Sequence, residues 1–122
     1  MNGKRVGVVG PCTSGKTTLI RNLRVGYGVE LRHIGQEHSY VPYMWQKISN
    51  PDWLIFLDVS YEASKARKPL NWTEAEYQEQ QRRLAHAREH ADLYINTDGL
   101  SAEEVAQKVI QFLKELGLWN AA

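Results

Sequence analysis

Eight consecutive residues near the amino terminus have the types and spacing of a phosphate-binding loop. They fit the pattern G-x-x-x-x-G-K-T/S and are Gly10, Pro11, Cys12, Thr13, Ser14, Gly15, Lys16 and Thr17. An apolar run at residues 6–9 precedes them, and an amphipathic stretch begins at Thr17. Glycines let the backbone curl so that successive N–H groups point at phosphate oxygens, while the following helix presents its positive end to the same anion. We therefore expect residues 10–18, Thr18 included, to bind the phosphates of a nucleotide.

Two side chains of this loop could act directly on a bound nucleotide. Lys16 would reach the β- and γ-phosphates, and the hydroxyl of Thr17 would hold Mg²⁺. The alternative is a glycine-rich turn between a strand and a helix that binds no ligand. Both flanks match the setting that a phosphate loop requires, which favours nucleotide binding. For Cys12, inside the loop, a passive small side chain is the simplest interpretation.

The composition fits one domain and argues against several kinds of partner. A chain of 122 residues is long enough for a single domain, residues 1–122, and too short for two ordinary ones. With 15 basic and 14 acidic residues, its net charge of +1 provides no field to attract nucleic acid or an anionic membrane. The single cysteine excludes an intrachain disulfide, and no apolar run approaches the roughly twenty residues of a membrane helix. We expect a cytoplasmic protein, and so small a core is compatible with a homodimer or a protein partner.

Strands and helices are expected to alternate along the chain. Mostly apolar runs predict strands at residues 4–9, 31–34, 53–59 and 93–96. Helical periodicity and capping boxes predict helices at residues 17–24, 43–48, 60–68, 73–91 and from residue 101 onward. Residues that end helices are expected at Gly26, Gly28, residues 68–72 and Gly117. Such alternation implies right-handed crossovers. The predicted fold class is α/β, a three-layer α/β/α fold of the P-loop type with a short parallel sheet of about four strands.

The carboxyl ends of parallel strands share one edge of a sheet, and ligands bind there. This rule brings together the loop at residues 10–16, the segment around Glu37 and the residues just after Asp58. Asp58 ends an apolar strand, where a carboxylate can orient Mg²⁺, or it can instead cap the next helix. Glu37 competes for the metal or for a general-base role, with Gln36 and His38 as alternates.

Basic side chains are frequent after Asp58. Arg67 lies just before the expected break, where a guanidinium group could neutralise charge on a transferring phosphoryl group. The arginines at positions 82, 83 and 88 lie among acidic residues of the next helix, so a solvent-exposed face explains them equally well. His86 and His90 are one helical turn apart but lack an apparent third metal ligand.

Four stretches of the chain resemble the P-loop nucleoside and nucleotide kinase group. They are Gly-Val-Val-Gly-Pro-Cys-Thr-Ser-Gly-Lys-Thr-Thr-Leu at residues 7–19, and residues 51–67, 91–97 and 100–105. The resemblance implies a protein that binds ATP, or another nucleoside triphosphate, with Mg²⁺ and transfers the γ-phosphoryl group. It also implies a lid over the phosphates at about residues 67–91, with Arg67 as the lid arginine and Glu37 as the catalytic carboxylate. The same resemblance implies that Thr17 and Glu37 bind the metal and that Asp58 has a structural role.

The chain departs from that group where a phosphoryl acceptor would bind. Members of the group insert a helical acceptor-binding segment before the acidic strand, whereas only residues 25–30 are available here. The first hypothesis is a phosphotransferase in which Lys16, Glu37 and Arg67 act on ATP and a small molecule, nucleoside or nucleotide accepts the phosphoryl group. The second is a nucleotide-binding module that switches or assembles with a partner and transfers nothing. A GTP-dependent switch is a third, disfavoured because neither a D-x-x-G motif after Asp58 nor an N-K-x-D motif is present.

Overall fold

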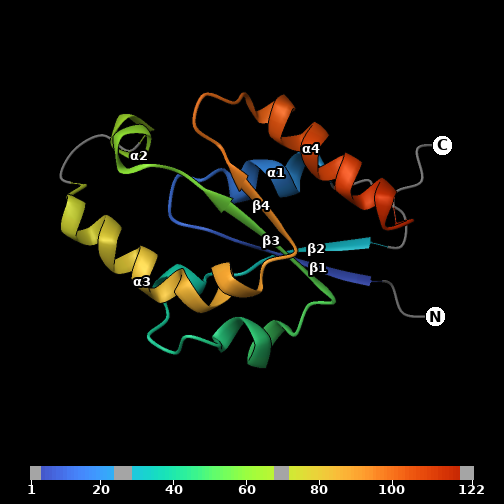
Figure 1. Cartoon of the computed structure of the whole chain (residues 1–122), viewed down its shortest axis with the longest axis horizontal. Helices are drawn as coiled ribbons and strands as arrows, with labels where there is room; N and C mark the ends of the chain where they lie inside the picture. Colours follow the sequence, from blue (N-terminus) through green and yellow to red (C-terminus); the bar gives the residue numbers. More distant parts are fainter. Residues whose placement is uncertain (1–3, 24–28, 68–71, 119–122) are drawn as a thin grey trace.

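In the part of the chain that the structure describes, four parallel strands form one sheet. The computed structural model describes residues 4–23, 29–67 and 72–118. The strands lie in the order β2-β1-β3-β4 (Figure 1). Their bounds are β1 Lys4–Val9, β2 Val29–His33, β3 Trp53–Asp58 and β4 Leu93–Asn96. Every neighbouring pair is parallel, which confirms the expected α/β class with a short parallel sheet.

The register of the sheet places the carboxyl ends of the strands at one edge. β1 is central, because Val6 pairs with Leu31 of β2 on one side and with Trp53 of β3 on the other. Beyond β3, Asp58 pairs with Asn96 of β4. Since all four strands run in the same direction, the loops that follow them are neighbours. These loops carry the residues of the candidate site.

Helices cover both faces of the sheet (Figure 1). The helices α1 (Lys16–Asn22) and α4 (Ala102–Glu115) lie on one face, and α3 (Glu74–His90) lies on the other. β3 supplies alternate side chains to two hydrophobic cores, Ile55 and Leu57 to the first and Leu54 and Phe56 to the second. The first core contains residues of α1 and α4, and the second contains residues of α3. Because both of its faces are covered, β3 has the continuous apolar sequence of a buried parallel strand.

Short helical segments lie in the connections between the strands and helices. A 3₁₀ turn, η1, spans Gln36–His38 after β2, a π-helical turn, η2, spans Trp45–Ser49 before β3, and α2 spans Tyr61–Arg67 after β3. η1 packs against α3. Trp45 is buried in the second core, which fixes the segment between η1 and β3 to the body of the protein.

The ends of the two long helices follow the sequence expectations. At the start of α3 the hydroxyl of Thr73 accepts a hydrogen bond from the N–H of Glu76, and the carboxylate of Glu76 accepts one from the N–H of Thr73. Ser101 and Glu104 form the same capping box before α4. After α4, Gly117 has a φ of 75°, and the N–H groups of this turn bond back to the last helical turn. Both capping boxes and the stop at Gly117 are confirmed.

Some element boundaries differ from the sequence expectation. β2 begins at Val29 rather than at residue 31, because its backbone pairs with β1 there, Val29 opposite Lys4, and ladder pairing does not require apolar side chains. The expected helix at residues 43–48 is instead the π-helical turn η2, which begins two residues later. The expected stops at Gly26 and Gly28 and the expected break at residues 68–71 lie outside the described residues. Within the described residues, none of the helices combines the length and the apolar character needed to cross a membrane.

Candidate functional site

The loop between β1 and α1 is wound tightly by residues with unusual backbone angles. Gly10 has a φ of 154°, and a Cβ at this position would lie 2.0 Å from the carbonyl oxygen of Leu57 in β3, so only glycine fits. Gly15 has a φ of 99°. Thr13, with a φ of 70°, holds a left-handed conformation that costs a non-glycine residue about 1–2 kcal/mol. Backbone strain of this kind is concentrated in ligand-binding loops.

Lys16 begins α1, and its side chain folds back along the loop. Its ammonium nitrogen lies 2.6 Å from the carbonyl oxygen of Gly10, 3.1 Å from that of Pro11 and 2.9 Å from Oε2 of Glu37. The side chain is only 5% exposed. A buried ammonium group requires acceptors for its three hydrogens and a counter-charge, and these three oxygens supply both. The structure thus puts Lys16 and Glu37, both selected from the sequence, in direct contact.

Glu37 belongs to η1, the turn that follows the carboxyl end of β2. Its side chain is 3% exposed, and Oε2 is engaged by Lys16. The other oxygen, Oε1, is buried and has no hydrogen-bond partner among the described residues. A buried acceptor left unsatisfied costs about 1–3 kcal/mol, so such an atom needs an explanation, and an absent ion or ligand is one.

Gln36 holds η1 in position beside the loop. Its Nε2 donates to the carbonyl oxygens of Val41 at 2.8 Å and Arg83 at 3.2 Å, and its Oε1 accepts from the N–H of Trp45 at 3.0 Å. The side chain is fully buried. Since both ends of its amide are occupied, Gln36 positions Glu37 and does not compete with it for a ligand.

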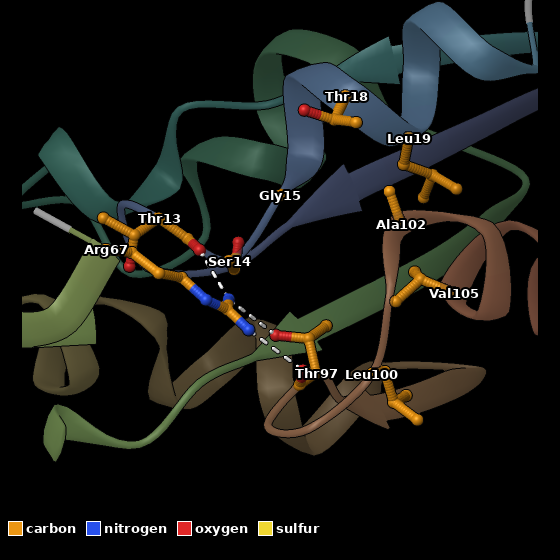
Figure 2. Close-up of a pocket in the computed structure, with 10 residues that line it drawn as sticks. All are labelled: Thr13, Ser14, Gly15, Thr18, Leu19, Arg67, Thr97, Leu100, Ala102 and Val105. Atoms are coloured by element: carbon orange, nitrogen blue, oxygen red, sulfur yellow. Dashed lines mark hydrogen bonds between the residues drawn. The ribbon is translucent and has the colours of Figure 1, made fainter. Parts of the chain in front are cut away.

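Arg67, at the end of α2, reaches the loop at Thr13 (Figure 2). Its Nη1 donates to the carbonyl oxygen of Thr13 at 2.8 Å and to Oγ1 of Thr97 at 3.1 Å, and its Nη2 donates to the carbonyl oxygen of Thr97 at 3.0 Å. Thr97 follows β4, and its hydroxyl donates to the carbonyl oxygen of Asp58 at 2.8 Å. The guanidinium group therefore ties the loop to the carboxyl end of β4.

Two cavities meet at the loop. The first has a volume of about 290 Å³ and is lined by Thr13, Ser14, Gly15, Thr18, Leu19, Arg67, Thr97, Leu100, Ala102 and Val105 (Figure 2). The second has a volume of about 320 Å³ and is lined by Cys12, Thr13, Gly15, Lys16, Thr17, Thr18, His33, Glu37 and His38. Every loop residue at positions 12–18 lines at least one of the two, so the loop forms their common wall.

Asp58 lines neither of these cavities. Its Oδ1 accepts from the N–H of Val59 and from Nε2 of Gln81, both at 2.9 Å, and its Oδ2 accepts from the hydroxyl of Tyr94 at 2.6 Å. Arg88 lies 3.6 Å from Oδ2. Burial and the hydrogen bond to Asp58 raise the pKa of Tyr94 to about 12, so its hydroxyl remains a donor at neutral pH. Asp58 therefore joins β3, α3 and β4, and the structure does not bring it together with the other predicted metal ligands.

The arginines of α3 contact the helix itself, the sheet or the segment around η1, where Nη1 of Arg83 donates to the carbonyl oxygen of Glu37 at 3.3 Å. Arg82 and Arg83 both pair with Glu79, one turn earlier on the same helix. Arg83 also lies over the ring of Tyr40, 4.1 Å from its centroid, and Arg88 lies over a ring of the second core. These three arginines line neither cavity at the loop.

Gln80 of α3 contacts the loop, although the sequence reading does not single it out. Its Oε1 accepts from the N–H of Cys12 at 2.9 Å, and its Nε2 donates to the sulfur of Cys12 at 3.2 Å. Gln80 is buried with Tyr77, Leu84 and Ala87 along α3. A glutamine among the buried positions of a helix must find partners for both ends of its amide, and that position is the signal that could have identified it.

The described structure is an α/β protein with a parallel sheet, and Glu37 and Arg67 contact the G-x-x-x-x-G-K-T loop, Glu37 through Lys16 and Arg67 through Thr13. No protein-family model and no curated protein matches the chain. The function is therefore inferred from the chemistry of the site itself.

Proposed function

We propose that the chain is a P-loop protein that binds ATP, or another nucleoside triphosphate, together with Mg²⁺ and transfers the γ-phosphoryl group to a small acceptor. The observation that carries this proposal is the buried contact between Lys16 of the G-x-x-x-x-G-K-T loop and Glu37 of the neighbouring loop. The motif supplies a lysine for the phosphates, and the contact supplies a carboxylate beside the same position. A glycine-rich turn without a ligand requires neither group.

Several groups of the loop suit a bound anion. The hydroxyl oxygens of Thr13 and Ser14 are buried, with no hydrogen-bond partner in the part of the chain that the structure describes. A phosphate oxygen in the loop would give each hydroxyl an acceptor. Lys16 belongs to the loop and Arg67 donates to it from α2, and their charges would stabilise a transferring phosphoryl group.

The first cavity suits the nucleoside part of the donor. Its walls include the apolar side chains of Leu19, Leu100 and Val105 and the hydroxyl-bearing side chains of Thr18 and Thr97. Its volume of about 290 Å³ lies near the lower end of the roughly 300–1,000 Å³ found for ligand pockets. A base and ribose present apolar faces with a few polar edges, which matches this lining.

The second cavity fits the metal. Mg²⁺ prefers oxygen ligands, carboxylates and hydroxyls among them. Thr17 and Glu37 both line this cavity, and Oε1 of Glu37 is unpartnered within the described chain. Mg²⁺ held by these two residues would neutralise charge on the β- and γ-phosphates. The oxygens of Asp58 already have partners, which favours Glu37 over Asp58 as the ligand.

The transfer step then depends on positioning and charge. The oxygen of the acceptor hydroxyl forms a bond to the γ-phosphorus, while the bond from that phosphorus to the β,γ-bridging oxygen breaks. Lys16 and Arg67 stabilise the negative charge that develops on the transferring group and on the leaving diphosphate. The proton of the acceptor hydroxyl leaves to solvent through the second cavity.

A nucleotide-binding module that assembles with a protein partner is the second candidate, and exposed side chains favour it. Tyr40, Val41, Tyr43 and Ile48 are exposed, Tyr40 by 81% and Ile48 by 73%. All four lie on the connection between η1 and β3. Exposed apolar side chains gathered on one segment are typical of contact surfaces. In this function the chain binds a nucleotide and transfers nothing.

Nucleotide binding is tested by isothermal titration with ATP and with GTP, each in the presence of Mg²⁺. We expect binding that the substitution Lys16→Ala abolishes and that Lys47→Ala, at an exposed lysine of η2, leaves unchanged. A wild-type chain that binds neither nucleotide would show the loop assignment to be wrong.

Phosphoryl transfer is tested by incubating the protein with ATP and a panel of nucleosides, nucleotides and small alcohols. Product that disappears in Glu37→Gln and Arg67→Ala supports the kinase, whereas nucleotide binding with slow hydrolysis or none supports the module. Glu30→Gln and Arg82→Ala change the same residue types at exposed positions and serve as matched controls.

A further inference from the structure

Cys12, Glu37 and His38 bring three potential metal ligands together beside the loop. The sulfur of Cys12 lies 4.0 Å from Nε2 of His38, and this nitrogen lies 3.6 Å from Oε2 of Glu37. One donor atom from each residue lies within 4.8 Å of the other two, and no further group of three His, Cys, Asp or Glu donors in the described residues does so. We propose that Cys12, Glu37 and His38 form a binding site for a thiophilic divalent cation, Zn²⁺.

The spacing of the donors suits zinc after only small movements. In tetrahedral sites the Zn–S distance is about 2.3 Å and the Zn–N distance about 2.0–2.1 Å, so sulfur and nitrogen ligands of one ion lie roughly 3.6 Å apart. The distance from Cys12 to His38 exceeds this by a few tenths of an ångström. Because the His38 side chain is 65% exposed, its ring can turn toward the sulfur without disturbing either hydrophobic core.

Glu37 offers a ligand atom that the fold leaves unused. Its Oε2 pairs with Lys16 at 2.9 Å, whereas its Oε1 is buried without a partner in the described part of the chain. Glu37, Cys12 and His38 line the same cavity. The oxygen that lies 3.6 Å from Nε2 of His38 is Oε2, and rotation of the carboxylate would present the unpartnered Oε1 to the same cation.

Gln80 fixes the position of Cys12 through hydrogen bonds to its N–H group and its sulfur. Its Nε2 donates to the sulfur at 3.2 Å, and its Oε1 holds the N–H of the same residue at 2.9 Å. Second-layer hydrogen bonds of this kind fix the direction of a metal ligand. On binding, the thiol of Cys12 loses its proton to solvent as the sulfur–zinc bond forms.

The chemistry of the donors selects Zn²⁺ over the Mg²⁺ that the proposed function requires. Sulfur and imidazole nitrogen are ligands of zinc, whereas Mg²⁺ takes oxygen ligands. Three protein ligands leave a fourth position for water or for a group that enters the second cavity. The consequence for activity rests on the proposed function, because zinc on Glu37 would remove the carboxylate assigned to Mg²⁺ and so inhibit phosphoryl transfer.

Titration of the metal-free protein with Co²⁺, in the absence of nucleotide, tests the site directly. We expect a sulfur-to-cobalt charge-transfer absorption that saturates with one ion per chain and disappears when Zn²⁺ displaces Co²⁺. Cys12→Ser and Cys12→Ala should each abolish the absorption, with folding verified by thermal unfolding. In competition with a chromophoric chelator, His38→Gln should weaken Zn²⁺ binding by more than the roughly 10- to 100-fold that loss of an outer-layer partner costs.

Matched histidine variants define the ligand set. His33→Gln changes a residue that lines the same cavity, and His90→Gln changes a member of the histidine pair on α3; neither should alter zinc affinity. The site is overturned if the wild-type protein gives no charge-transfer absorption, if Cys12→Ser retains it, or if His90→Gln removes binding as fully as His38→Gln. Titration with ATP in zinc-free buffer is the separate test of the proposed function, so either proposal can fail while the other holds.

Discussion

Nζ of Lys16 and Oε2 of Glu37 lie 2.9 Å apart, and each side chain is at least 95% buried. Lys16 follows β1 and Glu37 follows β2, the neighbouring strand, so this ion pair joins two loops at the carboxyl ends of the strands. When one member of such a pair is removed, the other is left as an uncompensated charge out of contact with water.

Substitution of Lys16 by methionine should therefore destabilise the fold strongly. We expect Lys16→Met alone to lower the free energy of unfolding by about 3–5 kcal/mol, and the double variant Lys16→Met/Glu37→Gln to be less destabilised than the sum of the single changes. Urea unfolding of the four proteins, followed by tryptophan fluorescence, measures the coupling. Additive effects would contradict the contact as described.

Replacement of Arg67 by lysine should not preserve phosphoryl transfer. The guanidinium group reaches Thr13 and Thr97 with two nitrogens at once, and a lysine ammonium cannot reproduce that fork. If the proposed function holds, we expect kcat to fall by about 100-fold or more. Steady-state kinetics of Arg67→Lys beside Arg82→Lys, an exposed control, provides the comparison. Equal rates in the two variants would exclude Arg67 from the transfer step.

The hydroxyl of Tyr94 should make stability depend on pH in the alkaline range. Its pKa is raised to about 12 by burial and by the hydrogen bond to Asp58, above the ordinary value of 10.0. A raised pKa gives stability that is complete below the unfolded-state pKa and is lost as the pH rises through the folded-state pKa. The wild-type protein should therefore lose stability between about pH 10 and about pH 12, and Tyr94→Phe should lose less over the same interval.

The comparison removes the contribution of a second phenol, because Tyr77, whose pKa is also raised by burial and by Asp58, is present in both proteins. Denaturant unfolding across this pH interval measures the difference. Parallel curves for the wild type and Tyr94→Phe would show that the hydroxyl of Tyr94 does not hold its proton through Asp58.

Asp58→Asn should separate a structural role from a metal-binding role. Hydrogen bonds to a charged group contribute about 1.5–3 kcal/mol each, so loss of the carboxylate should lower stability by an amount in this range. The Mg²⁺ dependence of nucleotide binding should stay as in the wild type, whereas Glu37→Gln should weaken it. Calorimetric titrations of nucleotide at several Mg²⁺ concentrations measure this dependence. If Asp58→Asn weakens it as much as Glu37→Gln does, Asp58 is a metal ligand.

The two loop glycines should respond differently to alanine. At Gly10 an added Cβ would lie 2.0 Å from a backbone oxygen of β3, so Gly10→Ala must shift the loop or the strand. At Gly15 no heavy atom lies within 4 Å of such a Cβ, and only the backbone conformation opposes it, at about 1–2 kcal/mol. Thermal unfolding should show a much larger loss for Gly10→Ala. Similar losses of stability in the two variants would indicate that the backbone at position 10 can move to accommodate a Cβ.

The local features of the fold could be predicted because neighbouring residues determine them. The apolar run of β3, the capping boxes at Thr73 and Ser101, and the stop at Gly117 depend on residues a few positions apart. The parallel sheet followed from the alternation of these elements. The start of β2 could not be predicted, since backbone pairing with β1 extends the strand past its apolar residues.

The candidate site was only partly predictable for the same reason. The G-x-x-x-x-G-K-T motif is continuous in sequence, and Glu37 could be placed at the same edge by topology. The contact of Asp58 with Tyr94 and the contacts of Cys12 with Gln80 and His38 join residues far apart along the chain, and they depend on how β4, α3 and η1 pack against their neighbours. Periodicity can show that a residue is buried, but it cannot name the atom that a buried polar group meets.

α3 has 17 residues and spans roughly 25 Å as a single rigid rod. Along its length it meets the loop through Gln80, the η1 turn through the carbonyl of Arg83, and the end of β3 through Arg88. A ligand that displaces Cys12 must therefore break the hydrogen bonds of Gln80 or carry α3 with it. In the second case α3 moves as one body. A ligand bound at the loop would then also shift the η1 turn and the end of β3, although it touches neither.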